Sequence, residues 1–205
     1  MVLDVDSTLI SCEVIELLAE HAGSRAQVAA ITDRAMRGEL DFAASLHERV
    51  ATLAGLPVTV LADVQREIEL TPGAFELLAE LARRGWPVGL VSGGFAEVVE
   101  PLAASLGIVH TRANRLEVAA GVLTGRVLGA VVDRAGKAAA LRAYAQLEGL
   151  DLAHTVAIGD GANDLAMMAA AGFSVAFNAK PLARAGADVA LDGRLDGVLE
   201  LLDRA

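Results

Sequence analysis

Short apolar segments alternate with longer segments of helical periodicity along most of this chain. Five of the apolar segments end in turn residues, a pattern typical of buried strands. Alternation of strands and helices predicts a mostly parallel sheet with helices on both faces. We therefore expect an α/β fold with a doubly wound, Rossmann-like parallel sheet. The five expected strands are Val2–Val5, Pro87–Val91, Val109–Asn114, Thr155–Ile158 and Ser174–Phe177.

Two regions interrupt this alternation. Residues 11–71 have helical periodicity almost throughout and separate the first two strands, so we expect an inserted helical cap on an α/β core of residues 1–10 and 72–205. In Arg115–Val127, apolar residues flank a turn, and we expect a small β-hairpin at the sheet edge. The four helices expected in the insertion are Glu13–Ala22, Arg25–Met36, Asp41–Ala54 and Thr59–Ile68.

The first expected strand is unusually short. Only Met1, Val2 and Leu3 precede Asp4, whereas strands usually have ~5–6 residues. Either the strand is simply short, or this sequence begins inside a longer natural chain; we favour the second.

Composition narrows the possible partners. The chain has 205 residues, enough for one domain with a large insertion. Its 27 acidic and 17 basic residues give a net charge of −10, so neither nucleic acid nor an anionic membrane is an expected partner. The single cysteine, Cys12, and the absence of a basic leader favour the cytoplasm. An acidic protein that handles an anionic substrate needs a local cation, which points to a metal.

Two carboxylates follow the first expected strand. Asp4 and Asp6 lie at its carboxyl end, where open α/β sheets place their ligands. Adjacent carboxylates repel each other unless a cation binds or one is protonated. A covalent phosphoryl mechanism uses both, one as the nucleophile and one as the proton carrier. A helix cap or Asx turn leading toward Glu13 explains the same residues equally well.

Two further motifs suit an anion. Ser92 and Gly93 close the second expected strand, where a hydroxyl and free backbone N–H groups at a helix start can approach a phosphate. Lys137 begins a helical stretch, a position where a cation opposes the helix dipole and suits a bound phosphate instead. An ordinary strand-to-helix turn and a solvated surface lysine are the alternative interpretations.

The last motif follows the fourth expected strand. Asp160 and Asp164 are four positions apart, with Asn163 between them and Gly159 and Gly161 flanking the first acid. Carboxylate oxygens suit Mg²⁺, which commonly shares a substrate phosphate. A capped helix start also accounts for these residues.

In this order, with each at a strand end or helix start, the motifs resemble those of the haloacid dehalogenase superfamily of phosphohydrolases. Within it the resemblance is closest to the phosphoserine phosphatases and covers nearly the whole chain. The residues that make this closer match are Glu13, Met36, Phe42 and Arg49.

The resemblance implies a role for each core residue. Asp4 is implied to be the nucleophile that becomes an aspartyl phosphate, and Asp6 to protonate the leaving oxygen and then activate water. Mg²⁺ is implied to be held by the Asp4 and Asp160 carboxylates and the Asp6 carbonyl, with Asp164 in support. The residues implied to bind phosphoryl oxygens are Ser92, Gly93 through its amide, Lys137 and Asn163.

The expected cap is implied to recognise the rest of the substrate. Glu13 would face an ammonium group and Arg49 a carboxylate, which a guanidinium fork binds better than lysine does. Met36 and Phe42 would form an apolar wall that excludes water. Each of these residues also has a purely structural interpretation. The two apolar residues could be core packing, Glu13 an acid that complements a helix dipole, and Arg49 a surface charge.

The implied activity is Mg²⁺-dependent hydrolysis of O-phosphoserine to serine and phosphate, the last step of serine biosynthesis. Another small-molecule phosphatase or phosphotransferase on the same scaffold is the nearest alternative. A receiver-like signalling module, phosphorylated on an aspartate without substrate turnover, is a more distant one. A receiver needs neither Asp6 as a proton carrier nor an inserted cap, so we favour the enzyme.

Overall fold

The computed structural model describes residues 1–36 and 39–203, without the side chain of Met36. Its seven strands form one sheet in the order β4-β3-β2-β1-β5-β6-β7. All neighbouring pairs are parallel except β3 and β4. The predicted α/β class with a mostly parallel sheet is confirmed. The strands are β1 (Val2–Leu3), β2 (Gly89–Phe95), β3 (His110–Ala119), β4 (Val122–Leu128), β5 (Val156–Gly159), β6 (Phe173–Phe177) and β7 (Val189–Leu191).

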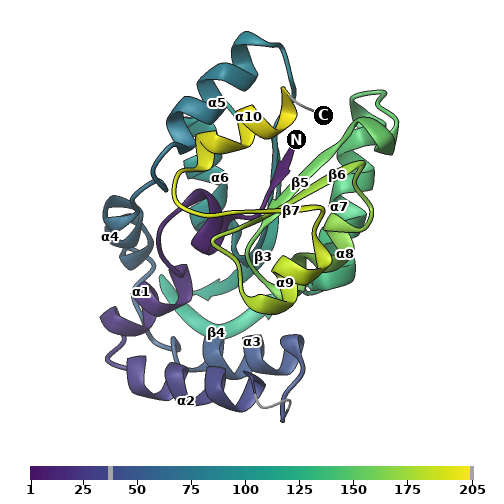
Figure 1. Ribbon diagram of the computed structural model, residues 1–205. Coiled ribbons are helices and arrows are strands. Elements are labelled where there is room, and N and C mark those ends of the chain that lie inside the picture. Colours follow the sequence, from purple (N-terminus) through teal and green to yellow (C-terminus); the bar gives the residue numbers. More distant parts are fainter. Residues whose placement is uncertain (37–38, 204–205) are drawn as a thin grey trace.

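Helices cover both faces of the sheet (Figure 1). The four helices expected before the second strand are present as α1 to α4, each within a few residues of its expected bounds. A π-helical turn (Val5–Leu9) and three short 3₁₀ turns complete the helical elements of the described chain. The α-helices are α1 (Val14–His21), α2 (Arg25–Met36), α3 (Phe42–Ala51), α4 (Val60–Glu67), α5 (Ala74–Arg83), α6 (Ala96–Ser105), α7 (Arg134–Leu147), α8 (Leu165–Met168), α9 (Pro181–Gly186) and α10 (Val198–Leu202).

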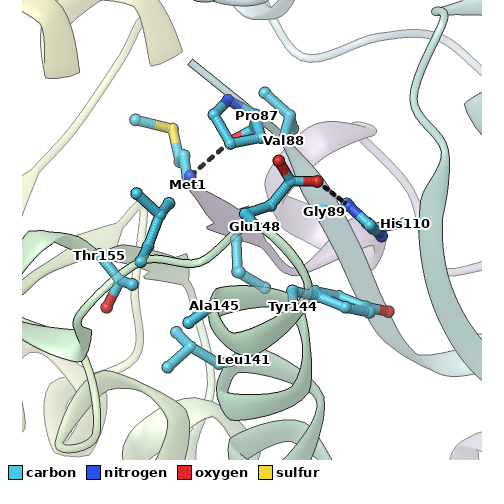
Figure 2. A pocket seen from close by; sticks show the side chains of 12 residues that line it. Met1, Pro87, Val88, Gly89, His110, Leu141, Tyr144, Ala145, Glu148 and Thr155 are labelled. Atoms are coloured by element: carbon cyan, nitrogen blue, oxygen red, sulfur yellow. Dashed lines mark hydrogen bonds and ion pairs between the residues drawn. The ribbon is translucent and has the colours of Figure 1, made fainter.

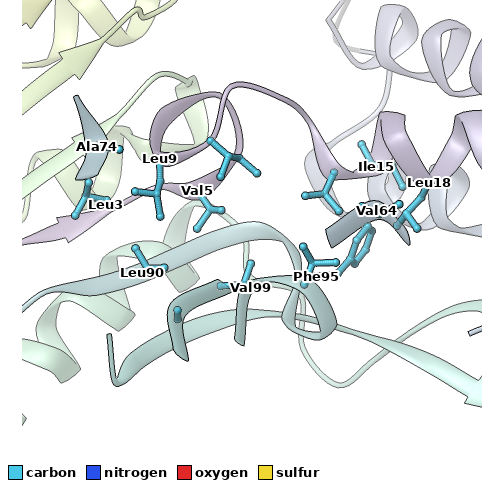
Figure 3. Close-up of a cluster of buried hydrophobic side chains, with 14 of the residues drawn as sticks. Leu3, Val5, Leu9, Ile15, Leu18, Val64, Ala74, Leu90, Phe95 and Val99 are labelled. Carbon is cyan, nitrogen blue, oxygen red and sulfur yellow. The ribbon is translucent and has the colours of Figure 1, made fainter. Parts of the chain in front are cut away.

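Successive apolar residues of each central strand point to opposite faces of the sheet. In β1, Leu3 belongs to the cluster packed by α5, α6 and α10, whereas Val2 belongs to the cluster packed by α7 and α8. Leu90 and Val91 divide in the same way along β2. Figure 3 shows Leu3 and Leu90 together in the larger cluster. Burial on both faces explains why these strands are continuous apolar runs rather than alternating ones.

The predicted hairpin is confirmed at the sheet edge. β3 and β4 pair in antiparallel fashion around the turn at Ala120 and Gly121. The segment after α3 adds backbone hydrogen bonds to this hairpin: Gly55 N–H donates to the carbonyl of Leu123 (2.9 Å), and Leu123 N–H donates to that of Leu56 (2.8 Å). The helices between β1 and β2 are thereby attached to the far edge of the sheet.

The first strand differs from its expected bounds. We predicted Val2–Val5, but β1 ends at Leu3, and Val5 opens the π-helical turn. Asp4 N–H still donates to the carbonyl of Ile158 (2.9 Å), so Asp4 is held against β5 where the chain leaves the sheet. The turn then requires a left-handed backbone at Ser7, with φ of +58°. A second difference is β7, a three-residue edge strand too short for the apolar pattern to reveal.

A small cavity lies at the amino ends of the strands, away from the predicted site residues. Figure 2 shows Met1 and Pro87 on one side of it, Leu141 and Tyr144 of α7 on the other, and Glu148 paired with His110. These residues are apolar or already paired, and none is a predicted site residue. Among the described residues, no helix combines the length and apolar character that crossing a membrane requires.

We predict that Gly89→Ala destabilises the fold. A Cβ at Gly89 would lie 2.5 Å from Cδ2 of Tyr144, the ring through which α7 packs on β2. Overpacking of this kind costs about 1–3 kcal/mol of the free energy of unfolding, measurable by urea denaturation. Gly136→Ala is the control, because the nearest atom to its Cβ is 3.5 Å away. Equal stabilities for the two variants would contradict the close approach of α7 to the sheet.

Candidate active site

Topology brings the predicted core residues to one edge of the sheet. β1 lies between β2 and β5, and all three strands run in the same direction. Asp4 follows β1, Ser92 is in β2, and Asp160 follows β5. Because the carboxyl ends of parallel strands meet at the same edge, residues far apart in sequence come together there.

Lys137 is a fully buried cation within this group. Its ammonium lies 2.6 Å from Oδ1 of Asp4 and 2.7 Å from Oδ1 of Asp164. Lys137 and Asp164 are 0% exposed and Asp4 is 3% exposed. This placement excludes a solvated surface lysine. The helix itself begins earlier than predicted, at Arg134, because Asp133 caps it by accepting from Gly136 N–H at 2.8 Å.

Burial and like charge govern the ionisation of this cluster. Burial and the neighbouring Asp164 raise the pKa of Asp4 well above its ordinary value, against the opposing effect of Lys137. Burial acts to lower the pKa of Lys137, but Asp4 and Asp164 outweigh it and the net shift is upward. One ammonium therefore does not neutralise the cluster, and a second cation would favour the ionised form of Asp4.

Three of the acids form a group that could hold a metal ion. One oxygen each from Asp4, Asp160 and Asp164 lies within 4.8 Å of the others. Burial and then Asp164 raise the pKa of Asp160 to about 6. An all-oxygen donor set suits a hard divalent cation such as Mg²⁺. Asp164 also accepts from Lys137 and, at 3.0 Å, from Gly161 N–H, so its carboxylate is already engaged by the protein.

Asp6 has a different environment from Asp4. Its Oδ1 accepts from Val14 N–H at 2.9 Å, and its Oδ2 accepts from the Ser92 hydroxyl at 3.0 Å. Desolvation by the surrounding protein, reinforced by Glu13, raises the pKa of Asp6 to about 6. A carboxyl group with a pKa near the working pH can both donate and accept a proton. The two acids of this motif are therefore physically distinct.

Two glycines let the chain approach closely beside Asp6. A Cβ at Gly94 would lie 2.6 Å from Oδ2 of Asp6, and one at Gly93 would lie 2.8 Å from Cζ of Phe42. Phe42 is the first residue of α3, so this contact brings the insertion against the end of β2. Phe42, one of the residues predicted for the apolar wall, thus lies against Gly93, which follows Ser92 in β2.

The two predicted substrate charges also lie near Asp6. Glu13 accepts from the Ser7 hydroxyl at 2.7 Å, and it caps the start of α1 without a side-chain hydrogen bond to that helix. Arg49 is half-buried, and burial lowers its pKa, opposed first by Glu13 and then by Asp6. Its Nε donates to the carbonyl of Ser45 at 3.3 Å. The charges of Glu13 and Asp6 thus both act on Arg49, and that of Glu13 also acts on Asp6.

The remaining predicted residues are placed as follows. Asn163 lies half-buried in the 3₁₀ turn that ends at Asp164. Met36 ends α2, and its side chain is outside the described residues. Cys12 is half-buried, and burial followed by Asp6 raises the pKa of its thiol to about 11.

Sequence reasoning missed three contributors to this site. The Ser7 hydroxyl donates a hydrogen bond to Glu13, and Gly94 has no side chain to clash with Asp6. The Asn114 amide donates to the Gly93 carbonyl at 2.8 Å. Asn114 could have been found, since it is a polar residue at the carboxyl end of an expected strand. Ser7 gave no such signal, because its role depends on a left-handed turn.

Comparison with known proteins agrees with these motifs. The family model described as haloacid dehalogenase-like hydrolase matches residues 1–169. The chain is 56% identical over 203 residues to a phosphoserine phosphatase of Mycobacterium tuberculosis, aligning 98% of this chain with 50% of that protein. It is 52% identical over 204 residues to a phosphoserine phosphatase of Streptococcus thermophilus, aligning 99% of this chain with 95% of that one. The chain thus spans about half the length of the first relative.

Solved structures agree in fold. One described as a phospho-aspartyl intermediate analogue of phosphoserine phosphatase has a TM-score of 0.92 and 41% identity, covering 98% of this chain and 96% of that one. A substrate-bound phosphoserine phosphatase complex has a TM-score of 0.92 and 40% identity, with the same coverage.

We predict that Mg²⁺ raises the melting temperature of this protein. A ligand that binds only the folded state adds about 2.7 kcal/mol at one hundred times its Kd. Asp160→Asn should abolish the shift, which differential scanning calorimetry measures. Asp63→Asn is the control, because Asp63 is a helix residue paired with Arg66. An undiminished Mg²⁺ shift in Asp160→Asn would show that the ion binds elsewhere.

Proposed function

The chain belongs to the haloacid dehalogenase-like hydrolase family, and from this premise we propose that it is a Mg²⁺-dependent phosphoserine phosphatase. It would hydrolyse O-phosphoserine to serine and phosphate as the last step of serine biosynthesis in the cytoplasm. The observation that carries the proposal is the pairing of Asp4 with Lys137 beside a separately held Asp6. This arrangement provides one acid for attack and another for proton transfer.

The first half-reaction uses both acids. An oxygen of Asp4 attacks phosphorus while the bond from phosphorus to the serine oxygen breaks, and Asp6 gives its proton to that oxygen. Lys137, 2.6 Å from Oδ1 of Asp4, holds the carboxylate in place and favours its ionised form. The products are an aspartyl phosphate at Asp4 and free serine.

The second half-reaction reverses the role of Asp6. Asp6, now ionised, takes a proton from water, whose oxygen attacks phosphorus as the bond to the Asp4 oxygen breaks. The Asp4 carboxylate and inorganic phosphate are released. A pKa of about 6 for Asp6 suits both tasks, since donor and acceptor forms are both accessible near neutral pH.

The residues around the acids would hold the phosphoryl group. We assign this binding to the Ser92 hydroxyl, the Gly93 amide, Lys137 and Asn163. Mg²⁺ held by the Asp4 and Asp160 carboxylates and the Asp6 carbonyl, beside Asp164, would neutralise phosphoryl charge when bound. The oxygen-only donor set of the acidic group supports this ion.

We assign substrate choice to the helices α1 to α3, within a cap formed by residues 11–71 on a core of residues 1–10 and 72–205. Glu13 would bind the substrate ammonium and Arg49 its carboxylate, while Met36 and Phe42 exclude water. The contact of Phe42 with Gly93 supports closure of this region over the phosphoryl site. The effect of the Glu13 charge on the pKa of Arg49 supports the placement of both residues around one zwitterion.

A phosphate-release screen over phosphorylated amino acids and sugars tests the proposal. With Mg²⁺, phosphoserine should be the preferred substrate, and EDTA should abolish release. Preference for a sugar phosphate would favour another phosphatase on this scaffold. Incorporation of phosphate without turnover would favour a receiver.

We predict that the two acids fail in different ways. Asp4→Asn should abolish turnover, because an amide does not attack phosphorus. Asp6→Asn should retain inorganic phosphate binding but lose about 10²–10⁴-fold in kcat, the usual contribution of acid–base assistance. Steady-state phosphate release and calorimetric phosphate titration measure the two properties. Near-normal turnover in either purified variant would remove that residue from its assigned role.

We predict that Arg49→Ala alters selectivity more than catalysis. A hydrogen bond to a charged group contributes about 1.5–3 kcal/mol, equivalent to roughly a 10–150-fold loss in kcat/KM for phosphoserine. Hydrolysis of p-nitrophenyl phosphate, which lacks the carboxylate, should fall far less. Arg25→Ala is the control, since Arg25 is an exposed residue of α2 paired with Glu20. Equal losses on both substrates in folded Arg49→Ala would contradict the carboxylate contact.

A further inference from the structure

One buried side-chain amide bridges the carboxyl-terminal half of β2 and the segment that precedes α7. Asn114 in β3 is 1% exposed, and both ends of its amide are used. Its Nδ2 donates to the Gly93 carbonyl at 2.8 Å, and its Oδ1 accepts from Val132 N–H at 2.7 Å. These partners also fix the orientation of the amide, because a carbonyl only accepts and an N–H only donates.

The first bond controls the direction of one peptide group. In a planar trans peptide the C=O and N–H point in opposite directions. By holding the Gly93 carbonyl, Asn114 therefore turns Gly94 N–H to the opposite side, where it donates to the Ser92 hydroxyl oxygen at 2.7 Å. The Ser92 hydroxyl in turn donates to Oδ2 of Asp6 at 3.0 Å. Asn114 is thus connected to Asp6 through one peptide and one hydroxyl.

The second bond controls the approach to α7. Val132 is 3% exposed and directly precedes Asp133, the residue that caps α7. Lys137 lies in the first turns of this helix, between Asp4 and Asp164. By accepting from Val132 N–H, Asn114 fixes the point from which the Lys137 helix starts. Both of its bonds therefore lead to charged residues of the site.

We propose that Asn114 is a positioning residue that sets the separation between the Ser92–Asp6 pair and the Lys137 helix. The Asn114 amide carries a donor and an acceptor on one planar group, and it satisfies both backbone partners at once. A leucine or alanine side chain has no donor or acceptor, so either substitution leaves the Gly93 carbonyl and the Val132 N–H without this partner. The reaction that Asn114 serves rests on the proposed function, whereas the geometry does not.

The test compares Asn114→Ala and Asn114→Leu with Ser174→Ala. Ser174 is 3% exposed, and its hydroxyl also makes two hydrogen bonds, with the Asp188 carboxylate (2.7 Å) and the Asp188 N–H (3.0 Å). It lies near the amino end of β6, away from the site residues. Loss of Ser174 therefore reports the effect of lost stability alone.

We expect kcat for p-nitrophenyl phosphate to fall by up to about 10²-fold in both Asn114 variants, as misplacement of catalytic groups by an ångström can cause. KM should rise by less than kcat falls. Ser174→Ala should keep the wild-type kcat despite a similar loss in melting temperature. A kcat in either folded Asn114 variant that matches Ser174→Ala would overturn the proposal.

Amide hydrogen exchange gives a readout that needs no activity. In the wild-type protein the Gly94 and Val132 amides should be protected, and both should exchange faster in the Asn114 variants but not in Ser174→Ala. A wild-type Gly94 amide that exchanges like an exposed turn amide overturns the proposal even if neither Asn114 variant folds. Failure of wild type to hydrolyse phosphoserine while it hydrolyses p-nitrophenyl phosphate would refute the proposed substrate and leave this test intact.

Discussion

The buried ammonium of Lys137 connects three segments that are far apart in the sequence. Its ammonium lies between the acid after β1 and the acid of the turn after β5, while its own helix packs on β2. A buried lysine is tolerated only when paired, and a buried cluster of acids is tolerated only with cations. When all three acids are ionised, one ammonium does not neutralise them, and Asp4, Asp160 and Asp164 form a group that could hold a metal ion.

Binding of phosphate and choice of substrate fall to different parts of the chain in the proposed function. In the proposed function, Asp4, Ser92 and Lys137, which lie at the sheet edge and in α7, bind only what every phosphomonoester has in common. Arg49 and Phe42 come from α3, which belongs to the helices inserted between β1 and β2. On the proposed function, the insertion would set the choice of substrate, while the charges that act on phosphorus stay with the core.

The sequence predicted those parts of the candidate site whose residues lie at or near the carboxyl ends of strands. Asp4, Ser92 and Asp160 were located because parallel strands bring their carboxyl ends to one edge. The bond between Ser92 and Asp6 spans 86 positions and depends on the strand order and on the left-handed turn at Ser7, neither of which leaves a local pattern. The early end of β1 and the extra strand β7 were missed because segments of two or three residues have no periodicity.

The covalent step at Asp4 is the centre of this account, and chemical trapping tests it most directly. The protein would be quenched during steady-state turnover of O-phosphoserine and treated with borohydride, which reduces an acyl phosphate but not a carboxylate. Peptide mass mapping should find Asp4 converted to homoserine and Asp6 unchanged. An unmodified Asp4 during active turnover, or reduction at Asp6 instead, would contradict the assignment of Asp4 as the nucleophile.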